Sequence, residues 1–186
     1  MMQLNLDFTK FPELETTRLR LREVVDNDVE EVFFLRSDKD VMKFIPRYPA
    51  KTKQDALDHI EVLRKVKESQ EGINWAITQK GNDTLIGMIG FYRMNKDAFR
   101  AEVGYILHPD YQGKGIISEA LQKVMEFGFE QMKLHSITAI IDPENIASEK
   151  VLQKANFVKE AHFKEDFYFN GEFLDSVHYS IINPQH

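Results

Sequence analysis

The stretch "AEVGYILHPDYQGKGIISEAL", residues 101–121, joins a strand-like run to a helical one through Gly113 and Gly115. Apolar spacing after the glycines predicts a helix from Ile116 to about Gln131. The first amides of such a helix lack partners within it, and the helix dipole adds partial positive charge there. Glycines at this point either let the backbone approach an anion or only form a tight turn. The pattern therefore indicates a phosphate-binding loop, with a plain turn as the alternative.

Two further strand-like runs precede this stretch. Residues 74–79, 84–93 and 100–107 are separated only by "KGND" and "MNKDAF", which predicts an antiparallel meander. Alternation within the last run places its side chains on two opposite faces. One face carries Glu102, Gly104 and Ile106, and the other carries Val103, Tyr105 and Leu107.

Strands and helices are also predicted upstream of the meander. Residues 16–24 alternate as a half-buried strand, and a helix is expected from Asp26 or Asp28 to Arg36. A capping-box pattern then opens a helix over about residues 52–71. Its expected buried stripe is Ala56, Leu57, Ile60, Leu63 and Val66.

The C-terminal part continues the alternation. Residues 136–142 form a β-branched run typical of a strand, and residues 144–156 predict a short helix that ends near Asn156. Asn170 and Gly171 stand between aromatic alternations, which is a strong hairpin signal. We therefore expect a strand, helix, strand, helix, strand order here, followed by a terminal hairpin.

Composition restricts the class of protein. The 186 residues carry a net charge of -6 and no block of Lys or Arg, which argues against nucleic-acid binding. The absence of cysteine excludes disulfides, thiolate metal ligands and a cysteine nucleophile. With no basic leader and no apolar run near 20 residues, about the length that spans a bilayer, we expect a cytoplasmic protein without a membrane partner. The length fits one domain, residues 1–186.

Two common phosphate-binding motifs do not match the glycine pair. A P-loop requires GxxxxGK[ST], and neither glycine has that spacing. A dinucleotide fingerprint requires GxGxxG at the start of a βαβ unit, but Ser118 occupies the third glycine position and the preceding strand belongs to a meander. A nucleotide-binding domain is therefore disfavoured.

The segment "YQGKGIISEAL" instead resembles the acyl-CoA pyrophosphate loop of the GNAT N-acetyltransferases, whose motif is Q/R-x-x-G-x-G/A. Gln112 and Gly115 match this motif, whereas Ile117 replaces its final Gly or Ala. Further stretches resemble the RimJ/RimL-like branch of the family in order along the chain: "RLRLREV", "GMIGFYR", "AEVGYILHPDYQGKG" and "ENIASEKVLQKANFV". The resemblance implies an α/β (α+β) GNAT fold, with a mixed central sheet of about seven strands flanked by about four helices.

The resemblance also implies acetyl-CoA as the acyl donor, bound between two central strands that splay apart. The backbone of Ile106 and Leu107 would pair with the pantetheine arm. The amides that would hold the pyrophosphate belong to Gln112, Gly113, Lys114, Gly115, Ile116 and Ile117. No covalent enzyme intermediate is required by this chemistry, in agreement with the absence of cysteine.

Glu102 is the first candidate for the catalytic base. An alkyl ammonium is mostly protonated at pH 7, so a base must remove a proton before the amine attacks, directly or through water. Family members often place an acidic residue at this position. The alternative is a structural carboxylate paired with Arg93 or Arg100 across the hairpin.

Asn145 and Ser148 stand at i and i+3 around a helix start, on neighbouring positions of one face. In the resembling branch, this Asn contacts pantetheine and this Ser protonates the departing thiolate. Asn145 as a plain N-cap is the alternative. The tyrosine that many other family members place one or two turns later is missing from "VLQK".

Other polar and aromatic residues are weaker candidates. His108 fits a turn, and the scattered histidines His135, His162 and His178 lack metal-ligand spacing, so no metal is expected. Trp75 and the later Phe and Met stripe fit a core. Either an acceptor pocket or ordinary packing explains Phe33, Tyr48, Tyr92 and the aromatic tail from Phe167 to Phe173.

The sequence thus predicts an acetyl-CoA-dependent acyltransferase that moves an acetyl group to a primary amine by direct attack in a ternary complex. The amine of a protein or peptide N-terminus, as in ribosomal-protein-acetylating relatives, is the leading acceptor. A small amine such as a polyamine, amino sugar or antibiotic is the alternative, as is a noncatalytic CoA-binding module. Relatives are often homodimers, and the aromatic C-terminal hairpin is the candidate surface for one.

Overall fold

The computed structural model describes residues 3–184, which contain a mixed sheet of eight strands in the order β1-β2-β3-β4-β5-β6-β8-β7. Neighbouring strands are antiparallel except β5 and β6, which run parallel. The strands span Leu14–Glu15 (β1), Leu19–Glu23 (β2), Ile73–Gln79 (β3), Asn82–Asn95 (β4), Arg100–Leu107 (β5), Ser136–Ile141 (β6), Val158–Phe169 (β7) and Glu172–Ile182 (β8).

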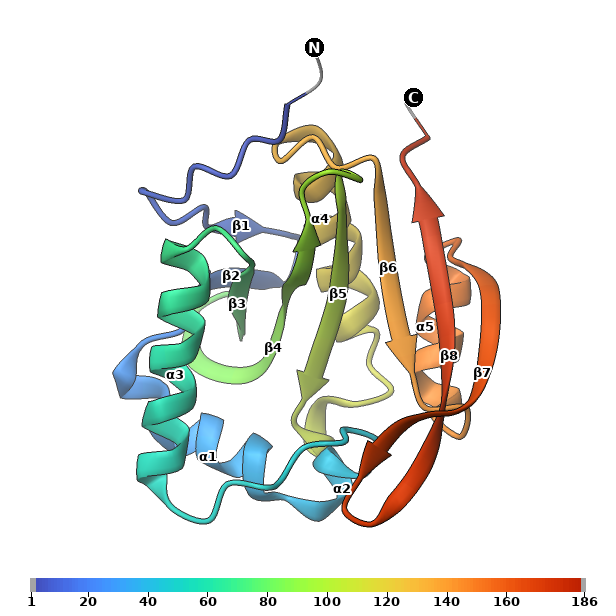
Figure 1. The fold of residues 1–186 in the computed structure, drawn as a ribbon. Coiled ribbons are helices and arrows are strands. Elements are labelled where there is room, and N and C mark those ends of the chain that lie inside the picture. Colours follow the sequence, from blue (N-terminus) through green and yellow to red (C-terminus); the bar gives the residue numbers. More distant parts are fainter. Residues whose placement is uncertain (1–2, 185–186) are drawn as a thin grey trace.

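Helices cover both faces of the sheet (Figure 1). The first three pack on one face, over a cluster of apolar side chains that includes Val32, Ile60 and Met88. The last two lie on the opposite face, over the larger part of the core. The helices span Val29–Ser37 (α1), Lys39–Met42 (α2), Lys53–Glu68 (α3), Ile116–Glu130 (α4) and Ile146–Lys154 (α5).

The described residues thus hold one strand and one helix more than the expected seven and four. The additional elements are very short. β1 is a two-residue strand held by pairing with β2, and α2 is a single turn that the side chain of Asp38 caps. Neither is long enough to show a hydrophobic period, which is why the sequence pattern does not reveal them.

The structure confirms the longer predicted elements. β3, β4 and β5 form the antiparallel meander, and Asn156 adopts a left-handed conformation after α5, with φ of 64°. Asn170 and Gly171 have φ of 52° and 92°, as expected in the turn between β7 and β8. The third helix ends earlier than predicted, at Glu68, with Gln70 in a left-handed turn at φ of 57°.

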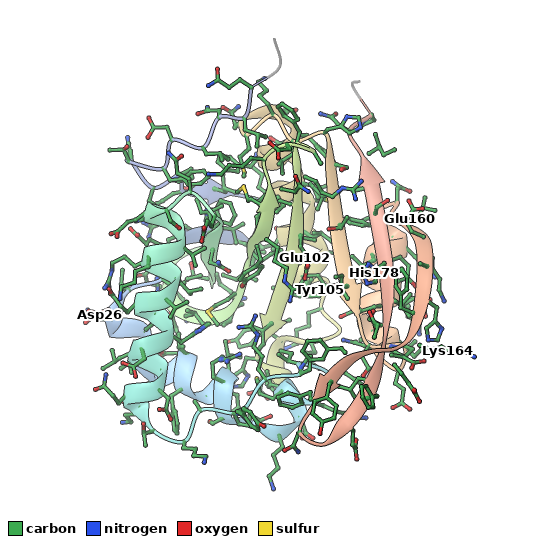
Figure 2. The ribbon with its side chains drawn as sticks, in the orientation of Figure 1. Asp26, Glu102, Tyr105, Glu160, Lys164 and His178 are labelled. Atoms are coloured by element: carbon green, nitrogen blue, oxygen red, sulfur yellow. The ribbon has the colours of Figure 1, made fainter. Side chains whose placement is uncertain are left out.

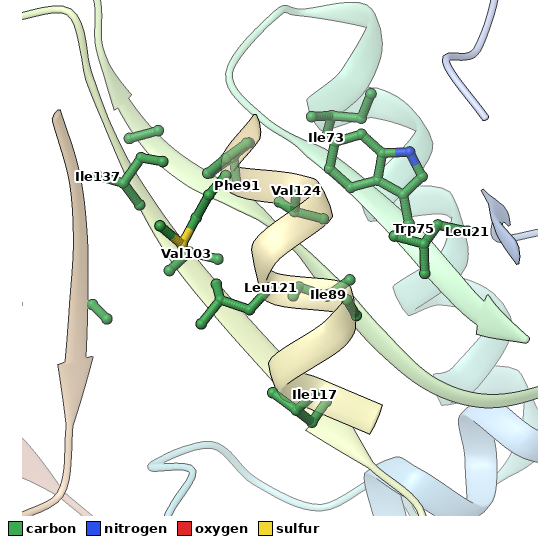
Figure 3. Packing of buried hydrophobic residues seen from close by; sticks show 14 of the residues in the cluster. Leu21, Ile73, Trp75, Ile89, Phe91, Val103, Ile117, Leu121, Val124 and Ile137 are labelled. Carbon is green, nitrogen blue, oxygen red and sulfur yellow. The ribbon is translucent and has the colours of Figure 1, made fainter. Parts of the chain in front are cut away.

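The main core lies between α4 and the central strands. Leu121 and Val124 of α4 are fully buried against Ile89 and Phe91 of β4 (Figure 3). Trp75 is also fully buried, and its indole N–H donates a hydrogen bond of 2.7 Å to the carbonyl oxygen of Pro12. This packing holds α4, and therefore the loop before it, rigidly against the sheet.

The pairing between β5 and β6 stops partway along the two strands. Their register runs from Arg100 opposite Ser136 to Glu102 opposite Thr138 and no further, although both strands continue. The two ribbons start side by side and diverge toward the loop before α4 (Figure 1). Backbone groups beyond Glu102 and Thr138 on the facing edges therefore lack a partner strand.

Candidate active site

The loop between β5 and α4 adopts a conformation that glycine favours. Gly113 and Gly115 have φ of 70° and 74°, and Gly115 is the N-cap of α4. A Cβ atom at Gly113 would meet nothing within 4 Å, and one at Gly115 would meet only the Arg18 guanidinium at 3.6 Å. Left-handed backbone, and not crowding, is thus the reason for glycine here. The turn aims the free amides at the start of α4 outward.

Contacts from the start of β2 fix this loop. Arg18 donates one hydrogen bond to the carbonyl oxygen of Lys114 at 3.1 Å and another to the carboxylate of Glu119 at 2.6 Å. The Thr16 hydroxyl also donates to Glu119. Burial acts to raise the pKa of Glu119, but the hydrogen bonds from Thr16 and Arg18 outweigh it and hold this pKa below its ordinary value. A charged Glu119 therefore ties the loop to the sheet.

A cavity of about 610 Å³ opens where β5 and β6 separate. Its walls include the backbone stretch 103–106 of β5 and the stretch 139–141 of β6. Other parts of the cavity wall come from α1, α3 and the segment 44–47. Of the residues predicted to contact the donor, Ile106 and Asn145 line the cavity, whereas Leu107 and residues 112–117 lie beyond its lining.

Glu102 lies on β5 at the centre of the sheet, beside the cavity (Figure 2). Its carboxylate accepts a hydrogen bond of 2.9 Å from the Arg93 guanidinium. The Glu102 side chain is 19% exposed and that of Arg93 is 64% exposed. The alternative predicted from sequence, an ion pair across the hairpin, is therefore present, and it leaves the carboxylate in the cavity wall.

The predicted contact of Asn145 with its own helix is also present. The Asn145 side-chain oxygen accepts a hydrogen bond from the Ser148 amide at 3.1 Å, which makes it the N-cap of α5. Both residues line the cavity. The cap consequently fixes the first turn of α5, and with it the position of the Ser148 hydroxyl.

Tyr105 is a further candidate for a proton donor, although strand alternation predicted its side chain on the face of β5 opposite to Glu102. Its hydroxyl is buried and has no hydrogen-bond partner among the described residues. Burial raises the pKa of Tyr105 to about 12, and the neighbouring Ser148 acts in the opposite direction, although their hydroxyls lack hydrogen-bond geometry. The structure thus places the Tyr105 hydroxyl near that of Ser148; this tyrosine comes from β5 and not from α5.

The part of the cavity wall that comes from α1, α3 and the segment between them carries polar side chains that the sequence pattern did not indicate, and Tyr92 of β4 lines the same cavity. Arg36 comes from α1, Arg47 from the segment before α3, and His59 from α3. Burial, together with the charges of Arg36 and Arg47, lowers the pKa of His59 to about 4, so His59 is neutral at pH 7. Burial likewise raises the pKa of Tyr92 to about 12.

The remaining predicted residues have structural contacts. His108 accepts a hydrogen bond from the Asp110 amide at 3.2 Å, as expected for a turn, and Ile117 is buried in the core. Tyr48 stacks on Phe169 with ring centroids 4.9 Å apart. Among residues 3–184, no group of three or more His, Asp or Glu side chains could hold a metal ion, and no helix is long and apolar enough to cross a membrane.

Comparison with known proteins identifies the family. Residues 18–158 match the model of the acetyltransferase (GNAT) domain, which is most of the chain. The chain is also 34% identical to the uncharacterized N-acetyltransferase YoaA of Bacillus subtilis over 175 residues, covering 94% of this chain and 99% of that protein. The chain therefore belongs to the GNAT family and is an N-acetyltransferase.

Solved structures share the fold. A GNAT-family acetyltransferase from Bacillus anthracis is 31% identical with a TM-score of 0.83, covering 92% of this chain and 99% of that one. RimL, a ribosomal L7/L12 α-N-protein acetyltransferase in complex with coenzyme A, has 21% identity and a TM-score of 0.82 over 92% and 98%. A Vibrio cholerae spermidine N-acetyltransferase in complex with CoA and spermine has 23% identity and a TM-score of 0.79 over 90% and 97%. The last two establish the fold only.

Proposed function

We propose that this enzyme transfers an acetyl group from acetyl-CoA directly to a primary amine within a ternary complex. The observation that carries the proposal is the cavity at the separated edges of β5 and β6, which Glu102 and Ser148 both line. A donor arm and an acceptor amine could occupy this cavity together. The absence of cysteine agrees with direct transfer.

The residues around the cavity fit acetyl-CoA as the donor. Backbone groups of β5 beyond Glu102 that face β6 have no partner strand, and they suit the amides of a pantetheine arm, which would add to this edge as a strand does, toward Ile106 and Leu107. The amides of residues 112–117, at the N-terminus of α4, suit a pyrophosphate. Asn145 lines the cavity beside this path and suits a contact with the pantetheine arm.

Three proton transfers accompany the reaction. The carboxylate of Glu102, directly or through a water molecule, accepts a proton from the acceptor ammonium, and the neutral nitrogen then attacks the thioester carbonyl carbon. The carbon–sulfur bond breaks, the Ser148 hydroxyl protonates the departing thiolate, and the second proton of the attacking nitrogen passes to the Ser148 oxygen, directly or through water, so that the amide and the CoA thiol are both neutral. Tyr105, whose buried hydroxyl neighbours Ser148, supplies a further proton donor at the same place.

The acceptor proposed here is the N-terminal amine of a protein or peptide. Support comes from the fold shared with the ribosomal-protein acetyltransferase RimL. The fold shared with a spermidine acetyltransferase keeps a small amine as the competing acceptor, because the same fold hosts both chemistries.

Thermal unfolding tests the donor first. Acetyl-CoA, ATP and NAD are added separately at equal concentration. A ligand present at about 100 times its dissociation constant stabilises a fold by about 2.7 kcal/mol, or several degrees for a chain of this size. We expect a shift with acetyl-CoA alone. Release of CoA thiol with a panel of primary amines then tests transfer, and binding of acetyl-CoA with no turnover of any primary amine would contradict the proposed acceptor class.

We further propose a cytoplasmic homodimer that associates through the β7–β8 hairpin. This hairpin exposes several large apolar side chains at the edge of the sheet, an arrangement that favours association. They are Val158, Phe163, Phe167, Tyr168, Phe173 and Ile182. Sedimentation equilibrium of the wild type and of Phe173→Ser tests this, and a monomer in both samples would rule it out.

A further inference from the structure

The cavity wall from α1 and the segment before α3 carries two arginines without acidic partners. Among residues 3–184, neither Arg36 nor Arg47 forms an ion pair with a carboxylate. Arg36 is half-buried and Arg47 is exposed, and the charge of Arg47 lowers the pKa of Arg36, with burial as the larger cause. Two like charges that face one cavity repel each other, and an anion bound between them relieves this repulsion.

The carboxylates of the same cavity do not supply that anion. Glu102 is paired with Arg93, and Glu71 is solvent-exposed and makes no ion pair with either arginine. His59 is neutral at pH 7 and adds no charge of its own, and its ring nitrogens are available for hydrogen bonding. The net charge around Arg36 and Arg47 is therefore positive, although the whole chain carries a charge of -6.

Tyr92 connects this positive end with the candidate base. Tyr92, Arg36, Arg47 and Glu102 all line the cavity; burial is the main cause of the raised pKa of Tyr92, and the charges of the other three groups also act on it. In the sheet, Tyr92 pairs with Glu102 across β4 and β5. A ligand that contacts the arginines can consequently also reach the Glu102 carboxylate.

We propose that Arg36 and Arg47 form an anion subsite for the acceptor, which is therefore an amine whose carrier bears a carboxylate close to the reacting nitrogen. This inference rests on the proposed function and narrows it. A guanidinium binds a carboxylate with two parallel hydrogen bonds, and such charge-assisted bonds are about twice as strong as neutral ones. A polycation such as spermidine meets repulsion at the same place. The carboxylate comes either from an acidic side chain near a peptide N-terminus or from a free amino acid.

Matched acceptors test the subsite. The first set is three amidated tetrapeptides, Ser-Glu-Ala-Ala, Ser-Gln-Ala-Ala and Ser-Lys-Ala-Ala, and the second is L-serine, serinamide and spermidine. In one set, we expect kcat/KM for the carboxylate acceptor, the glutamate peptide or L-serine, to exceed kcat/KM for its amide at least about tenfold. A tenfold ratio corresponds to about 1.4 kcal/mol. The set that shows the preference identifies the source of the carboxylate. Equal rates for acid and amide in both sets, or a preference for spermidine, would overturn the subsite and leave the transferase intact.

Variants assign the effect to the two arginines. Arg36→Gln and Arg47→Gln should each lower the acid-to-amide ratio of kcat/KM at least about threefold, through a higher KM for the acid acceptor. Arg47→Glu, on an exposed residue, should favour the lysine peptide. Arg20 lies on β2 outside the cavity and forms an ion pair with Glu13. Arg20→Gln removes this pair; it is the matched control and should leave the ratio unchanged. An unchanged ratio in both arginine variants would overturn the assignment.

A binding measurement separates this inference from the proposed function. Calorimetry needs no turnover; it uses CoA-loaded protein with N-acetylated forms of the glutamate and glutamine peptides and with N-acetylserine and N-acetylserinamide. Tighter binding of the acid than of the amide in one pair, lost in Arg36→Gln, supports the subsite even if no amine is acetylated, and in that case the transferase proposal fails alone. Equal binding of acid and amide, or binding of neither, in both pairs overturns the subsite.

Discussion

The proposed donor end of the site consists of backbone atoms, whereas the proposed acceptor end consists of side chains that line the cavity. Gly115, the first amides of α4 and the separated edges of β5 and β6 come from local backbone geometry. Arg36, Arg47 and His59 come from three separate segments. The difference teaches that the donor site is inherent in the fold and tolerates many side chains, while the acceptor site depends on a few side chains that can change without altering the fold.

Glu102 stands where the two ends meet, and its replacement should have the largest effect. Glu102→Gln keeps the size and removes the base, so kcat should fall about 10²- to 10⁴-fold, the usual contribution of general base catalysis. The measurement is the rate of thiol release at saturating acetyl-CoA. Ser148→Ala should lower kcat less if Tyr105 donates in its place, and Ser148→Ala combined with Tyr105→Phe tests that shared role.

Arg93→Gln is the control for Glu102. This change breaks the ion pair and keeps the carboxylate in the cavity wall. If Glu102 is the base, Arg93→Gln retains most of the turnover that Glu102→Gln loses. Equal losses in both variants would show that the ion pair, and not proton transfer, is what the enzyme needs from Glu102.

Gly115→Ala should weaken the donor end alone. A non-glycine residue at φ of 74° costs about 1–2 kcal/mol, so the melting temperature should fall by a few degrees. Displacement of the loop should raise the KM for acetyl-CoA about tenfold, because small misplacements in a binding site are costly. Gly81→Ala, at φ of 84° in an open turn, should show the same stability loss without the KM effect. An equal KM effect in both would contradict the role of the loop.

Glu119→Gln tests the same difference between the donor and acceptor ends, because it changes a residue of α4 that lies outside the glycine loop. This substitution removes the charge that holds Arg18, and through it the carbonyl of Lys114. We expect the KM for acetyl-CoA to rise by about three- to tenfold, since a hydrogen bond to a charged group contributes about 1.5–3 kcal/mol and the pair is partly exposed. The KM for the acceptor should not change. A rise in the acceptor KM alone would contradict the separation of the two ends.

His59 gives the smallest effect, a pH dependence of stability. Its pKa is 6.5 in the unfolded chain and about 4 in the folded one, so the unfolded state binds the proton first as pH falls. The contribution of neutral His59 is fully present above pH 6.5 and is lost between pH 6.5 and about 4. Wild type should therefore lose more thermal stability between pH 7.5 and 4.5 than His59→Asn. Parallel curves would contradict the buried, neutral state.

The fold was largely predictable because its long elements carry strong periods. The meander from β3 to β5 and the helix α4 follow from alternation, apolar spacing and short turns. The glycine loop also follows, since left-handed backbone requires glycine in a short local stretch. β1 and α2 did not follow, because two and four residues cannot display a period.

Only part of the cavity lining was predictable. Glu102, Ile106, Asn145 and Ser148 line the cavity, whereas Leu107 and residues 112–117 lie outside its lining, and the catalytic and binding roles of all these residues stay predictions. Arg36, Arg47 and His59 give no signal in the sequence, because tertiary packing alone brings α1, the segment before α3 and α3 together. Alternation assigned Tyr105 to the face of β5 opposite to Glu102. Its hydroxyl nevertheless lies near Ser148, because residues from both faces of β5 line the cavity where β6 separates from β5.

The early end of pairing between β5 and β6 leaves two strand edges that the proposed donor would join as a temporary strand. Amides of residues 103–107 and 139–141 that face the gap should exchange their hydrogens with solvent more readily than amides in a paired ladder. A bound acyl donor that takes their hydrogen bonds should slow this exchange along both edges. The binding of a small molecule would thus complete the secondary structure of the enzyme, and amide exchange would record how far that completion extends.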